Sequence, residues 1–368
     1  MSPDDLRGYL RQTLRVFDPV LSVVLTLILI LSILTVYSAG VDFPGRIEAH
    51  LRNVFVAILV CWLAANLPPN WIRGSAVPLY ILGIALLIAV ALFGDVSKGA
   101  RRWLNLGFTR IQPSELLKIA TPLMLAWWFH RRQGALQARD FVVSALLLLL
   151  PTVLIARQPD LGTAVLVLAA GAYVIFFAGV PWKILAGLGI SAFAALPLLW
   201  MFMHDYQRQR VLTLIDPSSD PLGKGFHIIQ STIAMGSGGP WGKGWMQGTQ
   251  AHLEFIPEST TDFVFAVFAE EFGLAGNLIL VTLYGCLIGR GLMIAANAAT
   301  LFMRLLAGSI TMIFFTYAFV NMGMVSGILP VVGVPLPLMS YGGTAMVTLA
   351  LGAGLLMSVH RHRKLVQT

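Results

Sequence analysis

Long runs of apolar residues are the feature that most restricts what this chain can fold into. The runs are about 20 residues long, the length that an α-helix needs to cross ~30 Å of hydrocarbon. Only 11% of the 368 residues are charged and 57% are hydrophobic, whereas a soluble domain carries about 25% charged residues. The sequence therefore predicts an all-α polytopic membrane protein.

The runs predict about ten transmembrane helices in a single transmembrane domain, residues 1–368. The expected spans are 19–39, 51–67, 75–94, 113–130, 141–156, 161–179, 183–203, 263–289, 302–328 and 342–359. The first run exceeds the length of a signal-peptide core, so we interpret it as a retained span. One long loop, at about 204–261, separates the seventh and eighth spans, and its length favours a functional role.

Basic residues in short flanking segments orient the spans. Three arginines lie within residues 7–15, and basic segments follow the fourth span (130–140) and the last span (360–364). With an even number of spans these segments share one side, so we expect both termini in the cytoplasm and the 204–261 loop outside. The outer side still holds 12 of the 25 Lys and Arg residues. Either the orientation is inverted or the outer surface holds cations for a purpose, and the arginines before the first span favour the second alternative.

The outer cations concentrate in three places, which predicts a site for an anionic substrate. They are Lys98, Arg101, Arg102 and Arg110 after the third span, Arg157 in a short turn, and Arg208, Arg210, Lys224 and Lys243 in the long loop. Such a group of cations suits a diphosphate, because it neutralises charge that develops on a leaving group. The glycine-rich GSGGPWGKG (236–244) departs from a phosphate loop at Ser237 and Gly244, so we interpret it as tight turns.

Two carboxylates stand out near the outer ends of predicted helices. Glu115 lies three residues before Lys118, on one helix face. The pair is either a structural ion pair or a device that holds Lys118 toward an anion in a cavity. Asp262 begins the eighth span, where it is either a helix N-cap or a general base. Glu270 and Glu271, deeper in that span, suit a structural role or a proton site.

Several long motifs are similar to those of the SEDS family (shape, elongation, division and sporulation proteins). They are GARRWLNLGFTRIQPSELLKI, RQPDLGTA, GSGGPWGKG, GTQAHLEFIPESTTDFVFAVFAEEFG and GVPLPLMSYGGT. The stretch GILPVVGVPLPLMSYGG (327–343) resembles the rod-shape-determining branch more than the division branch. The resemblance implies a ten-helix peptidoglycan glycosyltransferase of the cell inner membrane, which polymerises lipid II on its periplasmic side during cell elongation. It also implies a class B penicillin-binding transpeptidase of the PBP2 type as partner, beside other membrane proteins of the elongation complex. No nucleic acid is implied.

The resemblance also implies site residues. Asp262 matches the essential aspartate, which we expect to deprotonate the acceptor hydroxyl. The other matching positions are Arg101, Arg102, Arg110, Glu115, Lys118 and Asp160. We add Lys243 as a further substrate-binding candidate, and a divalent cation (Mg or Mn) could share the neutralisation of the diphosphate. Relatives often have a basic residue and a histidine where this chain has Ser259 and Thr260.

Two other classes of function compete with a polymerase. Charged residues inside spans, such as Lys118 and Glu270, are what a lipid II flippase or another transporter needs. Against this, the sequence shows no pair of broken helices in matching halves, and its charges cluster at one surface. A scaffold that only positions other enzymes predicts tolerance of Asp262→Asn.

Overall fold

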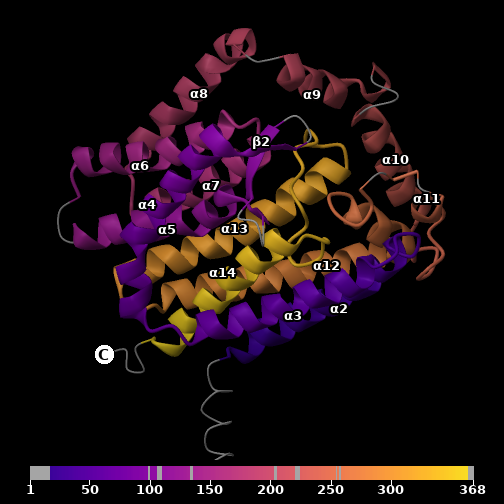
Figure 1. The fold of residues 1–368 in the computed structure, drawn as a ribbon, viewed down its shortest axis with the longest axis horizontal. Coiled ribbons are helices and arrows are strands. Elements are labelled where there is room, and N and C mark those ends of the chain that lie inside the picture. The colour runs from indigo at the N-terminus through magenta and orange to yellow at the C-terminus, as the bar shows by residue number, and fades with distance from the viewer. Residues whose placement is uncertain are drawn as a thin grey trace, which may run out of the picture.

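The computed structural model describes residues 17–97, 100–105, 110–132, 136–202, 205–219, 224–253, 255–256 and 258–363. Each expected span coincides with a helix of a mostly helical fold (Figure 1). These helices are α2 (Pro19–Ala39), α3 (Arg46–Ala65), α4 (Pro69–Phe93), α5 (Pro113–Arg131), α6 (Ala138–Ala156), α7 (Leu161–Phe177), α8 (Trp182–Phe202), α12 (Val264–Ala296), α13 (Leu301–Val325) and α14 (Gly343–Arg361).

Among the described residues, seven helices are long and apolar enough to cross a membrane: α2, α3, α4, α6, α12, α13 and α14. Helix α5 lacks this apolar character because it carries Glu115 and Lys118, and α7 has only 17 residues. The chain is therefore a multi-pass membrane protein, and the full count of ten crossings stays a prediction.

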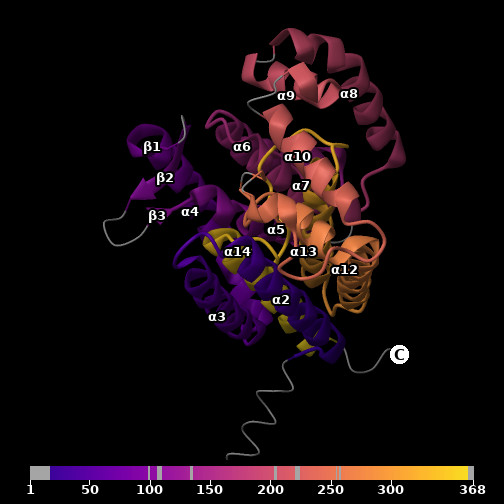
Figure 2. The same ribbon diagram turned by 90° about the vertical axis from the view of Figure 1, so that its right-hand side faces the viewer.

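Helix α13 forms the centre of the bundle. It is the most buried of the seven apolar helices and packs against α5, α7, α12 and α14, while α3 packs against α14 (Figure 1). A small antiparallel sheet of β1 (Asp95–Ser97), β2 (Ala100–Asn105) and β3 (Arg110–Ile111) joins α4 to α5 (Figure 2). This sheet lies at the same end of the bundle as the start of α5.

The two ends of the described chain meet at the opposite end of the bundle. The Asp18 carboxylate caps α2 by accepting a hydrogen bond from the Leu21 amide at 2.8 Å. It also accepts a 2.6 Å bond from Arg290 Nη2 of α12 and lies 3.4 Å from His360 Nε2 of α14. The start of α2 and the end of α14 therefore lie on one side of the bundle, as an even number of crossings requires.

This ion pair predicts a pH dependence of stability. Burial raises the pKa of the Asp18 carboxyl, but hydrogen bonds from Arg290 and Leu21 and the charge of His360 outweigh it, and the pKa is lowered overall. A carboxylate with a lowered folded-state pKa contributes stability above its ordinary pKa of about 3.9, and this is lost as the pH falls through the folded value. We expect Asp18→Asn to lower the thermal unfolding temperature at neutral pH. The difference from wild type should shrink below about pH 4, and a constant difference contradicts this account.

The segment predicted as a long loop is largely helical. It contains α9 (Asp205–Ile215), a 3₁₀ turn η1 (Pro217–Ser219), α10 (Lys224–Ser237) and α11 (Thr249–His252). Apolar residues of α10 such as Ile228 and Ala234 are buried, and α10 packs against α12. The turn residues that suggested a loop mark the breaks between these short helices.

Helix α12 is broken at Gly273, which has φ 64° and ψ −161°. The glycine-rich segment 239–244 pairs with the main chain on both sides of this break. The Lys243 and Gly244 amides donate to the carbonyls of Glu270 and Glu271 at 3.0 Å, and the Leu274 amide donates to the Gly239 carbonyl at 2.9 Å. Positive φ values at Gly239, Gly242 and Gly244 confirm the predicted tight turns. The break leaves main-chain amides and carbonyls of α12 without their helical hydrogen bonds, and the paired segment supplies partners for them. Hydrocarbon offers no water to do so.

Replacing Gly242 tests this pairing. Its φ is +82°, and a Cβ there would lie 2.0 Å from the Glu271 carbonyl oxygen. We expect Gly242→Ala to lower the free energy of unfolding by about 2–5 kcal/mol, from the left-handed backbone and the clash together. Gly236→Ala is the matched control, because Gly236 is exposed, lies in α10 and has no atom within 4 Å of the place that a Cβ would take. Equal unfolding of the two variants in detergent contradicts the pairing.

Candidate active site

Asp262 lies in a turn, residues 258–263, that leads into α12. Glu258 has φ 53°, and its carbonyl accepts from the Thr261 amide at 3.0 Å and the Phe263 amide at 3.3 Å. The N-cap residue of α12 is Phe263, so Asp262 does not occupy the N-cap position that the simpler interpretation gave it. Asp262 is partly exposed. The turn thus holds this partly exposed residue at a helix terminus.

The segment after α13, residues 326–342, packs over this turn. The Tyr341 amide donates to the Thr260 carbonyl at 2.8 Å. Asn321 Nδ2 of α13 donates to the carbonyls of both Asp262 (2.8 Å) and Val334 (2.7 Å), which fastens the turn to the segment. A Cβ at Gly333 would lie 3.3 Å from Asp262 Oδ2. The Asp262 carboxylate therefore faces the backbone of the 326–342 segment.

Lys118 forms a buried cluster with Glu115 and Tyr317. Its Nζ donates to Glu115 Oε1 and to the Tyr317 hydroxyl, each at 2.6 Å. Lys118 is 3% exposed, Glu115 9% and Tyr317 0%, and Glu115 Oε2 has no hydrogen-bond partner. The predicted pair is present, and Tyr317 of α13 is a third member. A lone tyrosine in an apolar run carries no sequence signal, so sequence reasoning missed it.

Asp160 joins the start of α7 to the start of α5. Its carboxylate caps α7 through the Thr163 amide at 3.3 Å and accepts from Gln112 Nε2 at 3.1 Å. Arg102 Nη2 of β2 donates to the Pro159 carbonyl at 2.5 Å. The sheet and the ends of these two helices therefore meet, which brings Arg102 and Asp160 beside the helix that carries Lys118.

The start of α7 also meets the segment that faces Asp262. A Cβ at Gly162 would lie 2.7 Å from the Val332 carbonyl oxygen, and Gly333, the next residue, is the neighbour of Asp262. One continuous set of contacts thus connects Asp262, the 326–342 segment, Asp160 and the Lys118 cluster. We call these residues, together with Arg102, the polar rim.

Lys243 lies in a different set of contacts. Its Nζ is 2.6 Å from Glu270 Oε1 and 2.7 Å from the Thr249 hydroxyl, and Glu270 also accepts from the Gln250 amide at 3.1 Å. Glu271 accepts from the Ser38 hydroxyl and from the Met246 amide. Both glutamates therefore fasten the 239–250 region to α12, which fits a structural role.

The other predicted positions are described only in part. Arg101 and Arg110 lie in β2 and β3, where Asn105 pairs with Arg110, but their side chains lie outside the described residues. Within the part of the chain that the structure describes, no group of three or more His, Cys, Asp or Glu side chains could hold a metal ion. A divalent cation that is shared with the substrate stays a prediction.

Comparisons with known proteins identify the family of this chain. The FtsW/RodA/SpoVE family, described as "Cell cycle protein", matches residues 13–365. Peptidoglycan glycosyltransferase MrdB of Escherichia coli (strain K12) is 51% identical over 350 residues, which cover 95% of each chain. Peptidoglycan glycosyltransferase RodA of Treponema pallidum (strain Nichols) is 30% identical, over 94% of this chain and 97% of that one.

Solved structures share the fold over almost the whole chain. A chain from a structure described as "Structural coordination of polymerization and crosslinking by a peptidoglycan synthase complex" has a TM-score of 0.82 and 34% identity, and covers 95% of this chain and 99% of that one. The rod shape determining protein RodA of Thermus thermophilus has a TM-score of 0.72 and 29% identity, over 94% and 97%. The chain belongs to the FtsW/RodA/SpoVE family.

Proposed function

We propose that this chain is a peptidoglycan glycosyltransferase that polymerises lipid II into glycan strands during cell elongation. The observation that carries the proposal is the partly exposed residue Asp262, whose carboxylate faces the 326–342 segment in the polar rim. Relatives that match nearly the full length are named peptidoglycan glycosyltransferases. The reaction takes place on the periplasmic side of the inner membrane.

In the proposed reaction, the 4-hydroxyl of the acceptor's N-acetylglucosamine attacks the anomeric carbon of the donor's N-acetylmuramic acid. The new C–O bond forms as the bond to undecaprenyl diphosphate breaks, and the α linkage of the donor becomes a β linkage in the product. Asp262 accepts the proton of the attacking hydroxyl. A positioned base of this kind contributes about 10²–10⁴-fold to a rate.

Cations of the polar rim hold and neutralise the diphosphate. An ammonium has three N–H donors, and Glu115 and Tyr317 take two from Lys118, which leaves one for a phosphate oxygen. Arg102 uses one N–H on the Pro159 carbonyl, and its buried Nε has no hydrogen-bond partner. Arg102 and Lys118 therefore keep donors for the leaving group, and we assign Arg101 and Arg110 to the same task.

A transpeptidase is the expected partner. The solved complex with TM-score 0.82 concerns coordination of polymerisation and crosslinking in a peptidoglycan synthase. A class B penicillin-binding protein would crosslink the strands that this chain polymerises, and the two activities would meet on the outer surface of the membrane.

Reconstitution in vesicles tests this function. The purified chain, with its partner transpeptidase, is given lipid II labelled on the sugar, and both glycan polymer and transbilayer movement of label are measured. We expect polymer from wild type and none from Asp262→Ala that is folded to the same extent. Movement of lipid II without polymer would instead show a flippase. If cells that carry Asp262→Asn grow normally, and neither wild type nor this variant makes polymer, the chain is a scaffold.

A further inference from the structure

We propose that α2 and α3 form a binding site for a lipid-linked diphosphate beside the Asp262 turn. Arg46 binds the diphosphate, and a cavity along α2 holds the prenyl chain. This inference deepens the proposed function and rests on it, since it says where one substrate molecule of the polymerase lies.

Arg46 is a cation at the same end of the bundle as Asp262. Its guanidinium carbon lies 4.7 Å from the centroid of the Tyr341 ring and 5.1 Å from that of Phe43, and its stem packs near Gly40 at the end of α2. No salt bridge to Arg46 occurs among the described residues. Two aromatic rings therefore orient the guanidinium of Arg46, a partly exposed residue, and its N–H groups remain available for phosphate oxygens.

The Asp262 turn itself supplies no cation. Residues 258–263 include two carboxylates, Glu258 and Asp262, and no basic residue. The Tyr341 ring contacts the Arg46 guanidinium, and the Tyr341 amide donates a hydrogen bond to the Thr260 carbonyl of this turn at 2.8 Å. A diphosphate bound to Arg46 would thus lie next to the turn that holds the proposed base.

One face of α3 leads from Arg46 toward the membrane interior. Arg46, His50, Val54 and Ile58 follow one another at intervals of four residues, so they lie on one side of the helix. His50 Nε2 lies 2.9 Å from Ser32 Oγ of α2, and this hydroxyl donates to the Met339 carbonyl. His50 therefore donates from Nε2, and its buried Nδ1 is an acceptor with no partner. The face changes from cationic to polar to apolar with depth, as an amphiphilic anion would require.

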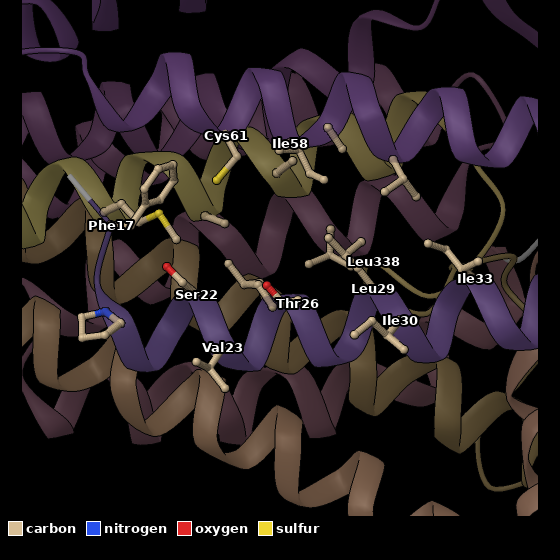
Figure 3. A pocket seen from close by; sticks show the side chains of 17 residues that line it. Phe17, Ser22, Val23, Thr26, Leu29, Ile30, Ile33, Ile58, Cys61 and Leu338 are labelled. Carbon is tan, nitrogen blue, oxygen red and sulfur yellow. The ribbon is translucent and has the colours of Figure 1, made fainter. Parts of the chain in front are cut away.

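The apolar part of this face opens on a cavity of about 680 Å³ between α2, α3 and α14. Figure 3 shows Thr26 and Leu29 of α2 opposite Ile58 and Cys61 of α3, with Leu338 between them. Lining residues of α2 extend from Pro19 to Ile33, a distance of about 21 Å at 1.5 Å per residue. Such a length is most of the ~30 Å hydrocarbon thickness, so the cavity suits a lipid chain.

The 326–342 segment links the cavity to the catalytic region along the chain. Leu338 lines the cavity, and three residues later Tyr341 contacts both Arg46 and the Asp262 turn. Arg46 lies eight residues before Val54, the nearest cavity residue of α3, which is about 12 Å along the helix. This spacing leaves room for the diphosphate and the first prenyl units above the cavity.

The diphosphate half of the proposal is tested by binding. Fluorescent farnesyl diphosphate, farnesyl monophosphate and a fluorescent phosphatidylglycerol are titrated into the purified full chain in detergent. We expect Arg46→Ala to weaken diphosphate binding at least about tenfold, the loss of hydrogen bonds to a charged group, and Arg46→Lys to weaken it less. Arg52→Ala is the matched control, since Arg52 is exposed on another face of α3, and should bind like wild type. Equal affinities for Arg46→Ala and Arg52→Ala at equal unfolding temperatures overturn the proposal, as does equal binding of all three ligands by wild type.

The cavity half is tested by filling the space. Thr26 is exposed and lines the cavity, whereas the neighbouring Leu27 is exposed without lining it. We expect Thr26→Trp to weaken binding of farnesyl diphosphate at least about tenfold and Leu27→Trp to leave it unchanged. Indistinguishable binding by these two variants overturns the cavity assignment. If wild type binds the diphosphate in this way but makes no polymer, the proposed function is wrong and the binding site is supported. If wild type makes polymer and Arg46→Ala binds the diphosphate normally, only the binding site is wrong.

Discussion

Asp262→Asn is expected to lower the rate of glycan polymerisation by about 10²–10⁴-fold. The amide keeps the size of the side chain but cannot accept a proton from the acceptor hydroxyl. The turn itself should persist, because the hydrogen bonds that fasten it to Tyr341 and Asn321 use the main chain of Thr260 and Asp262. Single-turnover polymerisation with labelled lipid II measures the chemical step.

Glu258→Gln is the matched control for this prediction. Glu258 is an exposed carboxylate of the same turn and accepts a hydrogen bond from the Thr261 hydroxyl at 3.0 Å. Its substitution should change the rate only a few-fold, because an exposed carboxylate four residues away is not the proposed base. A comparable loss in both variants, or a near-normal rate for Asp262→Asn, would remove Asp262 from its role as base.

Lys118→Met is expected to destabilise the fold by about 3–5 kcal/mol and to abolish polymerisation. The substitution leaves the Glu115 carboxylate buried without its counter-charge, which is the costly way to break a buried ion pair. It also removes the donor that we assign to the diphosphate. Denaturant unfolding in detergent measures the first effect and the polymerisation assay measures the second.

The double variant Glu115→Gln/Lys118→Met separates the two effects. Replacing both charges of a buried pair costs much less stability than removing one, so this variant should regain part of the lost free energy of unfolding and remain inactive. Tyr317→Phe removes one hydrogen bond to Lys118 and should cost about 1–3 kcal/mol. Recovery of activity in the double variant would show that Lys118 is only structural.

The helices could be predicted from the sequence because hydrocarbon permits few alternatives. A lipid-exposed backbone must satisfy its hydrogen bonds internally, so each apolar run had to be a helix, and all ten expected spans coincide with one. Asp262, Glu115 and Lys118 became candidates for the same reason, since charged residues near apolar runs are conspicuous. The ion pair of Glu115 and Lys118 could be predicted from their spacing on one helix alone.

Other features depend on tertiary contacts that no local pattern reveals. Tyr317 acquires its role only because α13 packs against α5, and Arg46 because the 326–342 segment returns to the start of α3. The break at Gly273 was missed because glycine is common in apolar helices, and the segment that pairs with it is about 30 residues earlier. Lys243 looked like the other outer cations, yet its partner is the buried Glu270.

The most direct test is a structure of the chain with bound lipid II and a non-reactive donor analogue. The account predicts that the acceptor 4-hydroxyl lies within about 2.6–3.2 Å of an Asp262 carboxylate oxygen, with the donor diphosphate against cations of the same end of the bundle. An acceptor hydroxyl remote from Asp262, or a residue 262 side chain directed into lipid away from every such cation, would contradict it.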